Sequence, residues 1–200
     1  RATLNDGRTV RARLLVGAEG RRSPTREAAG IRVAQWRYDH TAIIGSVFHA
    51  EPHNGVAHEI FYAQGPFAIL PLADDAEGRH RSALVWTVAS RHGAAMLDLP
   101  DRAFAAEAEK KMGGRLGPIT MASPRFSYPL GFHHAAHITA ERLALVGDAA
   151  HGIHPIAGQG LNLGFRDVAA LVEVLVDSAR TGLDFGDAQL LARYERWRAL

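Results

Sequence analysis

Residues 143–167 read LALVGDAAHGIHPIAGQGLNLGFRD, and this stretch decides how the rest of the chain is interpreted. The apolar run Arg142–Val146 predicts a short buried strand of the parallel type, and Asn162–Ala179 predicts a long helix. We expect five apolar side chains of that helix to face inward: Leu163, Val168, Leu171, Val172 and Leu175. Ligands of α/β sheets bind at the carboxyl ends of the strands. The strand ends in a tight turn, Gly147-Asp148, so the Asp148 carboxylate is a candidate acceptor for ribose hydroxyls.

The loop between the strand and the helix is punctuated by glycines. Gly158 and Gly160 permit the backbone to approach a flat ligand closely. Asn162 is expected in the first turn of the helix, where unpaired N–H groups and the positive end of the dipole favour an anion. The negatively charged pyrimidine edge of a reduced flavin would suit that position. A plain connector between a strand and a packed helix fits the residues alone about equally well.

The first segment also alternates strand and turn. Leu4–Thr9 predicts a hairpin turn with Asp6-Gly7 at its centre. Val10–Gly17 follows, and we expect Leu14–Val16 to form a short buried strand. A helix is predicted from Ser23 or Pro24 to Ala29, ending at Gly30.

The middle of the chain is rich in β-forming residues. Turns rich in Gly, Pro and Asp separate four such runs, a pattern typical of an antiparallel sheet. The runs are His40–Ala50, Ala57–Tyr62, Phe67–Leu72 and Ser82–Ala89. A helix over Pro100–Met112 and a strand over Phe126–Leu130 follow. We therefore expect residues 1–33 and 136–200 to be segments of one nucleotide-binding α/β domain, with residues 34–135 forming a separate β-sheet domain.

Composition excludes several classes of site. The net charge is +2, and the arginines are spread along the chain, so no nucleic-acid-binding arm is expected. The chain has no cysteine, which excludes disulfides and thiolate metal sites. Eleven histidines include His133, His134 and His137 at ligand-like spacing, and His151 with His154. No H-E-x-x-H pattern accompanies them, so no metal site is predicted.

Two motifs resemble one known family. Residues 147–167 resemble the C-terminal flavin-binding signature of the class A flavoprotein monooxygenases, which hydroxylate aromatic rings. The string H-P-x-A-G-Q-G-x-N-x-G-x-x-D is most similar to their ubiquinone-biosynthesis hydroxylase branch. Residues 15–26, LVGAEGRRSPTR, resemble the family's D-G-x-x-S-x-x-R motif, with Glu19 where the family usually has Asp. Residues 64–72, 82–86 and 125–130 resemble the sheet that covers the substrate in that branch.

The resemblance implies a fold and a chemistry. The fold would be α/β with an α+β insertion: the C-terminal part of a Rossmann-like FAD-binding domain plus a mostly antiparallel substrate domain, as in p-hydroxybenzoate hydroxylase. FAD would be the cofactor, and NAD(P)H the electron donor. The reaction would hydroxylate a polyprenylated phenol in ubiquinone biosynthesis, using O2 and a flavin hydroperoxide.

The resemblance also assigns residues. Those implied to bind the cofactor are Glu19, Gly20, Arg26, Gly147, Asp148, Pro155, Gly158, Gly160, Leu161 and Asn162. Those implied to line an apolar substrate pocket are Phe61, Phe67, Ile69 and Trp86. Ordinary core packing is the more common role for any one of these four.

The family's G-x-G-x-x-G turn, which holds the FAD pyrophosphate, does not occur in the sequence. We therefore expect a fragment, the C-terminal portion of a longer protein, that is inactive alone and binds FAD weakly or not at all. Its last segment, Gln189–Leu200, is predicted to be helical to the end.

The protein is expected in the cytoplasm. It could contact the membrane surface peripherally and belong to a ubiquinone-biosynthesis complex. The alternatives are a related flavoenzyme, either a prenyl reductase or a halogenase, and a non-catalytic scaffold that binds a quinone or a lipid.

Overall fold

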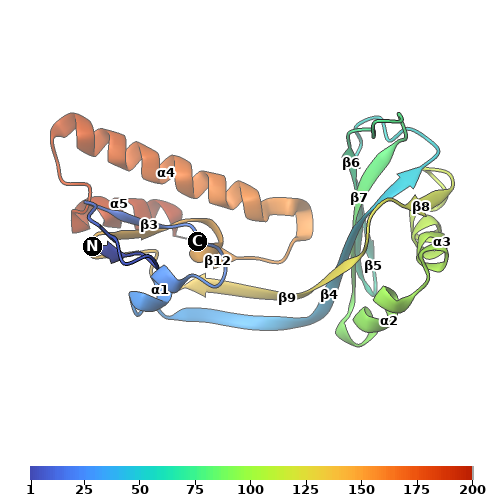
Figure 1. The fold of residues 1–200 in the computed structure, drawn as a ribbon, viewed down its shortest axis with the longest axis horizontal. Helices are drawn as coiled ribbons and strands as arrows, with labels where there is room; N and C mark the ends of the chain where they lie inside the picture. Colours follow the sequence, from blue (N-terminus) through green and yellow to red (C-terminus); the bar gives the residue numbers. More distant parts are fainter. Residues whose placement is uncertain (200) are drawn as a thin grey trace. The chain divides into compact units, whose positions relative to one another are not determined.

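The computed structural model describes residues 1–199, apart from the side chain of Ala157. The chain forms two compact units (Figure 1). Unit 1 consists of Arg1–Trp36 together with Gly131–Leu200, and unit 2 consists of Arg37–Leu130. The architecture is α/β with mostly antiparallel sheets, which confirms the predicted fold class.

Unit 1 is built on a short three-stranded sheet. Its strands, in spatial order, are β10 (Thr139–Ala140), β11 (Leu143–Leu145) and β3 (Leu15–Gly17). β11 is antiparallel to β10 and parallel to β3, with Leu145 opposite Gly17. Because β11 and β3 run in the same direction, the turns that follow them lie at the same edge of the sheet. The two sequence motifs are therefore neighbours in space.

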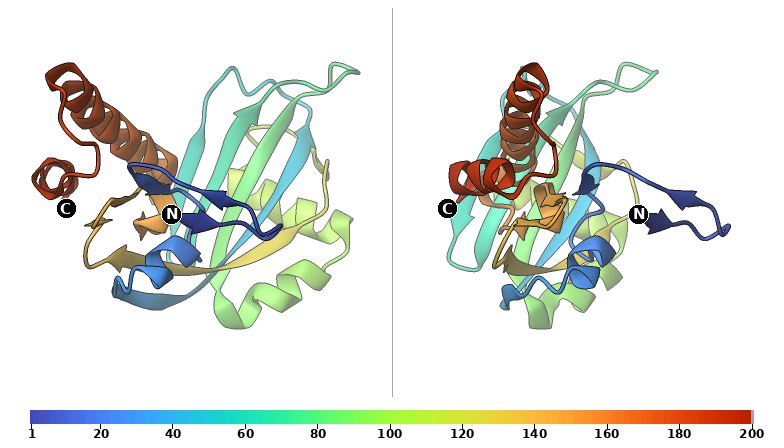
Figure 2. Two further views of the ribbon diagram at one scale, coloured as in Figure 1. Left: turned by 60° about the vertical axis from the view of Figure 1, so that its left-hand side comes forward. Right: turned by 90° about the vertical axis from the view of Figure 1, so that its left-hand side faces the viewer.

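Two helices complete the core of unit 1. α4 (Gln159–Thr181) and α5 (Ala188–Arg198) lie beside each other, as Figures 1 and 2 show. α4 ends at Gly182, whose positive φ of 71° is readily adopted by glycine. α5 begins at Asp187, whose carboxylate accepts hydrogen bonds from two backbone N–H groups of the first turn. The predicted helix to Leu200 is confirmed as far as Arg198; Leu200 lies outside the described residues.

The predicted inward face of α4 is partly wrong. Leu171 is buried, but Val168 and Val172 are 47% and 51% exposed. The buried face consists of Asp167, Ala170, Leu171, Val174 and Ser178. The prediction was partly wrong because it placed only apolar residues on the inward face. In the structure, the hydrogen-bonded carboxylate of Asp167 also lies on that face. The helix also begins at Gln159, so Asn162 is its fourth residue rather than its start.

The first segment agrees with the sequence in shape but not in burial. β1 (Ala2–Thr3) and β2 (Thr9–Val10) form the predicted hairpin, and α1 (Pro24–Ala28) is the predicted short helix. The expectation of a buried strand at Leu14–Val16 is wrong, because Leu15 and Val16 are 46% and 42% exposed. Among the described strands, β3 pairs only with β11, so it receives less cover than a central strand.

Unit 2 carries an antiparallel sheet with helices against one face, visible in Figure 2. The described strands of this sheet are β4 (Val33–His49), β5 (His58–Tyr62), β6 (Gly65–Leu72), β7 (Arg81–Ala89), β8 (Ile119–Met121), β9 (Phe126–Ala135) and β12 (His151–Gly152). β4, β9 and β12 reach into or belong to unit 1. The helices are α2 (Gly93–Asp98) and α3 (Asp101–Met112). The four predicted strand runs of the middle segment are confirmed.

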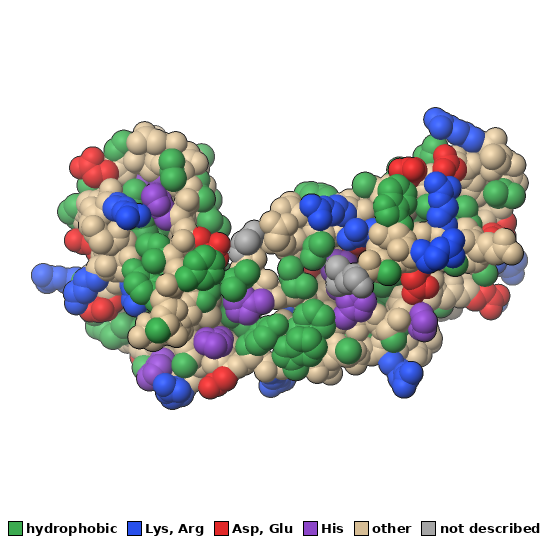
Figure 3. All heavy atoms as spheres, turned by 180° about the vertical axis from the view of Figure 1, so that it is seen from behind, with side chains coloured by type: hydrophobic (Ala, Val, Ile, Leu, Met, Phe, Trp, Pro, Cys, Tyr) green, Lys and Arg blue, Asp and Glu red, His purple; other side chains and the backbone are tan. Residues whose placement is uncertain are grey.

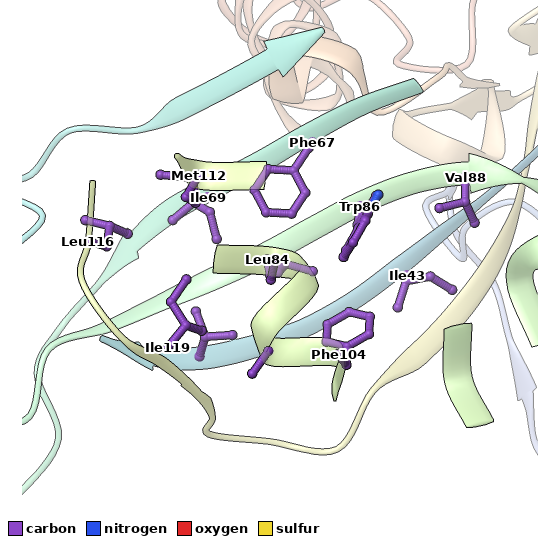
Figure 4. Close-up of a cluster of buried hydrophobic side chains, with 13 residues drawn as sticks. Ile43, Phe67, Ile69, Leu84, Trp86, Val88, Phe104, Met112, Leu116 and Ile119 are labelled. Atoms are coloured by element: carbon purple, nitrogen blue, oxygen red, sulfur yellow. The ribbon is translucent and has the colours of Figure 1, made fainter. Parts of the chain in front are cut away.

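The core of unit 2 lies between its sheet and α3 (Figure 4). Trp86 contacts Phe67 edge-on, with ring centroids 5.3 Å apart, and Phe104 of α3 at 5.4 Å. Phe67 and Ile69 are fully buried in this cluster. Close-packed aromatic and aliphatic side chains of this kind account for most of the stability of a domain of this size.

Candidate functional site

The candidate site forms where the two parallel strands of unit 1 end. The turn Ala18–Gly20 follows β3, and the 3-10 turn Gly147–Ala149 follows β11. The backbone pairing continues one residue past β11, because the Val146 N–H donates to the Gly17 carbonyl at 2.9 Å. The carboxyl ends of parallel strands are the usual ligand edge of α/β sheets. The geometry therefore brings both sequence motifs to the same edge of the sheet.

Glu19 is engaged by its own loop. Its Oε1 accepts hydrogen bonds from the Ser23 hydroxyl at 2.7 Å and from the Thr25 N–H at 2.8 Å. Burial raises the pKa of Glu19, but the hydrogen bonds from Thr25 and Ser23 outweigh that effect and lower it to about 2. The Ser23 Oγ in turn accepts from the Arg26 N–H and caps α1. Glu19 therefore remains ionised and organises the start of α1.

Arg26 joins the two motifs. Its side chain is buried, and its Nη1 donates to the Ala149 carbonyl at 2.8 Å. Its Nη2 donates to the Arg21 carbonyl at 2.9 Å, and its Nε has no hydrogen-bond partner among the described residues. The guanidinium thus holds the second motif's turn against the first motif.

The turn Gly147–Ala149 is held at each of its residues. Gly147 has a φ of +59°, and its N–H donates to the Asp167 carboxylate at 2.8 Å. The Asp148 carbonyl accepts from Nε2 of His133 at 2.8 Å, and the Ala149 carbonyl accepts from Arg26. The Asp148 residue itself is exposed, and its carboxylate makes no hydrogen bond or ion pair within residues 1–199. A fixed backbone with an available carboxylate is suited to accepting hydrogen bonds from a ligand.

Asp167 is the buried charge behind this turn. Its carboxylate is fully buried and accepts hydrogen bonds from His151 Nε2 at 2.7 Å, from Arg198 Nε at 2.7 Å and from the Gly147 N–H. Burial raises the pKa of Asp167, but the hydrogen bonds from His151, Arg198 and Gly147 offset it, and the net pKa is lowered. The carboxylate therefore stays ionised and ties the turn, the loop and α5 together.

The loop then leads to an uncapped helix start. Gly158, with a φ of +61°, is the N-cap of α4, and the first turn has neither a side-chain cap nor an acidic residue. The helix dipole gives such a terminus a partial positive charge. A Cβ placed at Gly158 or Gly160 would meet no other atom within 4 Å, so both positions border open space. Leu161 is 69% exposed, and Pro155 and Asn162 are also at the surface.

The turn after β11 packs directly on this helix. A Cβ on Gly164 would lie 3.5 Å from the Cα of Gly147. The absence of side chains at both glycines therefore permits the carboxylate-bearing turn to sit against the first turns of α4. The candidate residues from Gly147 to Asn162 all belong to unit 1, and Asp148, Pro155, Gly158, Leu161 and Asn162 are exposed.

Three residues of this arrangement were not predicted from the sequence. His133, Asp167 and Arg198 each hold the site from a separate element. The signal for Asp167 was its place as the last residue of the string H-P-x-A-G-Q-G-x-N-x-G-x-x-D, whereas His133 stood out only by its spacing from His134 and His137. Nothing in local sequence periodicity indicates Arg198.

The predicted pocket residues of unit 2 occupy different environments. Phe67 and Ile69 are fully buried and Trp86 is 7% exposed, all in the cluster under α3, whereas Phe61 is 67% exposed. The structure gives three of them a packing role. A role in contacting a substrate stays a prediction.

The charged side chains and the histidines are spread over the chain. Within residues 1–199, no group of three or more His, Asp or Glu side chains is arranged to hold a metal ion. On the face shown in Figure 3, basic side chains lie among acidic ones. Ion pairs between described residues include Arg142–Asp184 and Arg193–Asp177. None of the helices in the described part of the chain is long and apolar enough to cross a membrane.

Comparisons with known proteins agree with this geometry. The family model described as "FAD binding domain" matches residues 1–200. The chain belongs to this FAD-binding family. The chain is 52% identical over 197 residues to the ubiquinone hydroxylase UbiL of Rhodospirillum rubrum, covering 98% of this chain and 45% of that protein. It is 37% identical to the 3-demethoxyubiquinol 3-hydroxylase of Escherichia coli, covering 98% and 48% of the two chains.

A solved structure has a fold similar to that of this member of the FAD-binding family. The crystal structure of P. aeruginosa PqsL in complex with 2-aminobenzoylacetate superposes with a TM-score of 0.76 at 27% identity. The match covers 98% of this chain and 53% of that one. The chain spans about half the length of the curated relatives that it matches.

Proposed function

We propose that this chain forms part of the FAD site of a monooxygenase that hydroxylates a polyprenylated phenol in ubiquinone biosynthesis. The observation that carries the proposal is the exposed Asp148 carboxylate on a turn whose three residues are each held by a different side chain. The names of the relatives support the substrate class: a ubiquinone hydroxylase and a 3-demethoxyubiquinol 3-hydroxylase.

The residues present fit FAD. The Asp148 carboxylate is an acceptor for the hydroxyls of the cofactor, and the uncapped start of α4 favours the anionic edge of a flavin. The open space at Gly158 and Gly160 admits a flat ring close to the backbone. When bound, FAD supplies the redox chemistry that activates O2, with NAD(P)H as the proposed electron donor.

In this proposal the chain's own residues bind, orient and shield. The Asp148 carboxylate accepts hydrogen bonds from the hydroxyl groups of the cofactor, and Asn162 adds a polar contact from α4. Pro155 and Leu161 cover the ring and exclude water. Glu19 holds the loop after β3 through its bond from the Thr25 N–H, and Arg26 ties that loop to the Gly147–Ala149 turn through its bond to the Ala149 carbonyl. A direct cofactor contact by Glu19, Gly20 or Arg26 stays a prediction.

The first test measures FAD affinity in the full-length protein. Asp148→Asn keeps the size of the side chain but removes a charged acceptor, and we expect FAD affinity to fall about tenfold or more. Glu141→Gln is the matched control, because it makes the same change at an exposed residue of unit 1 in the β10–β11 turn. Equal FAD affinity in the two variants would contradict the role of Asp148.

The second test examines the reaction. The full-length protein, supplied with NAD(P)H, a polyprenylated phenol and 18O2, should yield a product with one labelled oxygen atom by mass spectrometry. A reduced prenyl chain, a halogenated ring or an unlabelled hydroxyl would indicate a different reaction.

We also propose a peripheral membrane contact, because a prenyl tail partitions into lipid, and membership of a biosynthetic complex. Co-sedimentation of the protein with lipid vesicles tests the membrane contact.

A further inference from the structure

We propose that His133 is a positioning residue, which orients the Asp148 carboxylate by holding the backbone carbonyl of Asp148. This inference rests on the proposed function, since it concerns the same cofactor site. His133 lies on β9, outside both sequence motifs, and nothing in the motifs assigns it a role.

The hydrogen bond fixes the protonation of the ring. Nε2 of His133 lies 2.8 Å from the Asp148 carbonyl, which only accepts, so Nε2 carries a proton. Nδ1 is buried and has no hydrogen-bond partner among the described residues. A proton on Nδ1 would therefore be an unsatisfied buried donor. Burial lowers the pKa of His133, and the nearby Arg21 and Arg26 lower it further despite the bond to Asp148. The ring is held as the neutral Nε2–H tautomer.

The position of the ring is fixed as well. His133 is 3% exposed and lies opposite Gly152 in the β9–β12 pair. A Cβ on Gly152 would lie 2.3 Å from Cε1 of His133 and 2.5 Å from its Nδ1. Only a glycine at position 152 leaves room for the imidazole, which therefore fits closely between β12 and the Gly147–Ala149 turn.

His133 holds a backbone group of the turn that Asp167 and Arg26 do not hold, the Asp148 carbonyl. Asp167 holds the N–H before Asp148, and Arg26 holds the carbonyl after it. The Asp148 carbonyl itself is held only by His133 among the described residues. Without that bond, the peptide plane after Asp148 loses its side-chain restraint and, among the described residues, is held only by the Ala150 N–H to Gly147 carbonyl bond that closes the turn, so the Asp148 carboxylate would be less well fixed. Preorganised groups of this kind raise affinity by reducing the ordering cost of binding.

The test compares two substitutions in the full-length protein. His133→Gln retains an amide N–H at about the reach of Nε2, whereas His133→Leu keeps similar volume without a donor. FAD affinity is measured by flavin fluorescence on reconstitution of the apoprotein. We expect the Leu variant to bind FAD about three- to tenfold more weakly, and the Gln variant to stay within about twofold of the unmodified protein.

A double-mutant cycle separates positioning from general packing. His133→Leu is combined with Asp148→Ala, and FAD affinity is measured for all four proteins. If His133 acts through Asp148, its substitution has no further effect once the carboxylate is gone. An equal loss in both backgrounds would overturn the inference, as would full affinity in the single Leu variant.

Outcomes for the two proposals are distinguishable. Full FAD affinity in Asp148→Ala would overturn the proposed role of Asp148 and this inference together. Weak binding by Asp148→Ala with normal binding by His133→Leu would overturn this inference alone. Should the Leu variant fail to fold, His133→Asn replaces it, because its shorter amide does not reach the Asp148 carbonyl. We then expect Asn to behave as Leu does, and affinity equal to the Gln variant would overturn the inference.

Discussion

At the scale of single residues, the site depends on one buried carboxylate. Asp167 is fully buried, and three donors from three separate segments compensate its charge. A buried charge is costly unless it is paired and hydrogen-bonded, and removal of either side of such an arrangement leaves the other uncompensated. Asp167 should therefore contribute to stability as well as to the shape of the loop.

Asp167→Asn should lower the free energy of unfolding by about 3 kcal/mol. A neutral amide offers one acceptor oxygen where three donors converge, and it leaves the Arg198 cation without its carboxylate. The measurement is urea unfolding of the apoprotein. The matched control is Asp177→Asn, on the same helix, whose ion pair with Arg193 is partly exposed. That control should change stability by less than about 1 kcal/mol; similar losses in both variants would contradict the prediction.

At this scale, the sequence alone predicts the place of Asp148 but not the residues that hold the turn around it. Asp148 could be predicted because it directly follows a buried strand, and strand ends in α/β folds bind ligands. His133 and Arg198 could not, because their bonds join segments that are distant in sequence: residue 133 to 148 and residue 198 to 167. Hydrogen bonds between distant segments leave no periodic trace in a sequence.

At the scale of elements, the start of α1 links the first motif to the fold. The Ser23 hydroxyl is fully buried; it donates to Glu19 and accepts from the Arg26 N–H. A capping hydroxyl of this kind satisfies an N–H group that the helix itself leaves unpaired. The Ser-Pro pair that predicted the helix start is thus confirmed by the cap geometry.

Ser23→Ala should destabilise the protein by about 1 kcal/mol, because the cap and the bond to Glu19 are both lost. Ser178→Ala makes the identical change on α4, where the fully buried Ser178 Oγ has no hydrogen-bond partner among the described residues. Removal of that hydroxyl should be neutral or stabilising, since it eliminates a buried unsatisfied polar atom. Chemical denaturation of both variants checks the pair, and a loss at Ser178 as large as that at Ser23 would refute it.

The helices show where element prediction fails. α3 was predicted nearly to the residue, because Phe104, Ala105, Ala108 and Met112 form one apolar face. For α4 the same reasoning chose the wrong side chains, since Val168 and Val172 are half exposed while Asp167 and Ser178 are buried. A polar residue on an inward face is visible only once its partners are known.

At the scale of the whole molecule, buried histidines link stability to pH. Burial lowers the pKa of His49 despite a bond to the Glu51 carbonyl, and nearby His53 and His80 lower it further, while Asp74 opposes them. Burial likewise lowers the pKa of His133. For both groups the folded protein binds fewer protons than the unfolded chain in the range just below the ordinary histidine pKa of about 6.5. Their contribution is present above that pH and is lost as the pH falls through the lowered pKa.

The free energy of unfolding should therefore fall between pH 7.5 and pH 5.5. Urea unfolding is followed by tryptophan fluorescence. Trp86 is buried in the core of unit 2, whereas Trp36 and Trp197 of unit 1 are about half exposed and should change less. His49→Gln should reduce the pH dependence, because it removes one buried site of proton uptake. His92→Gln, at an exposed ring, is the control and should leave the slope as in the unmodified protein. A stability that rises on acidification over this range would contradict the assignment.

The pairing of β3 with β11 also has a consequence for the order in which the protein is made. The parallel partner of Leu15 is Leu143, so the first strand leaves the ribosome long before its neighbour exists. Unit 2 is contiguous and can complete its fold in the meantime, since domains generally fold as they are synthesised. The ligand turn waits longer still, because Asp167 acquires its last donor only when Arg198 has been translated. Until that partner is made, the unpaired edge of β3 is open to aggregation.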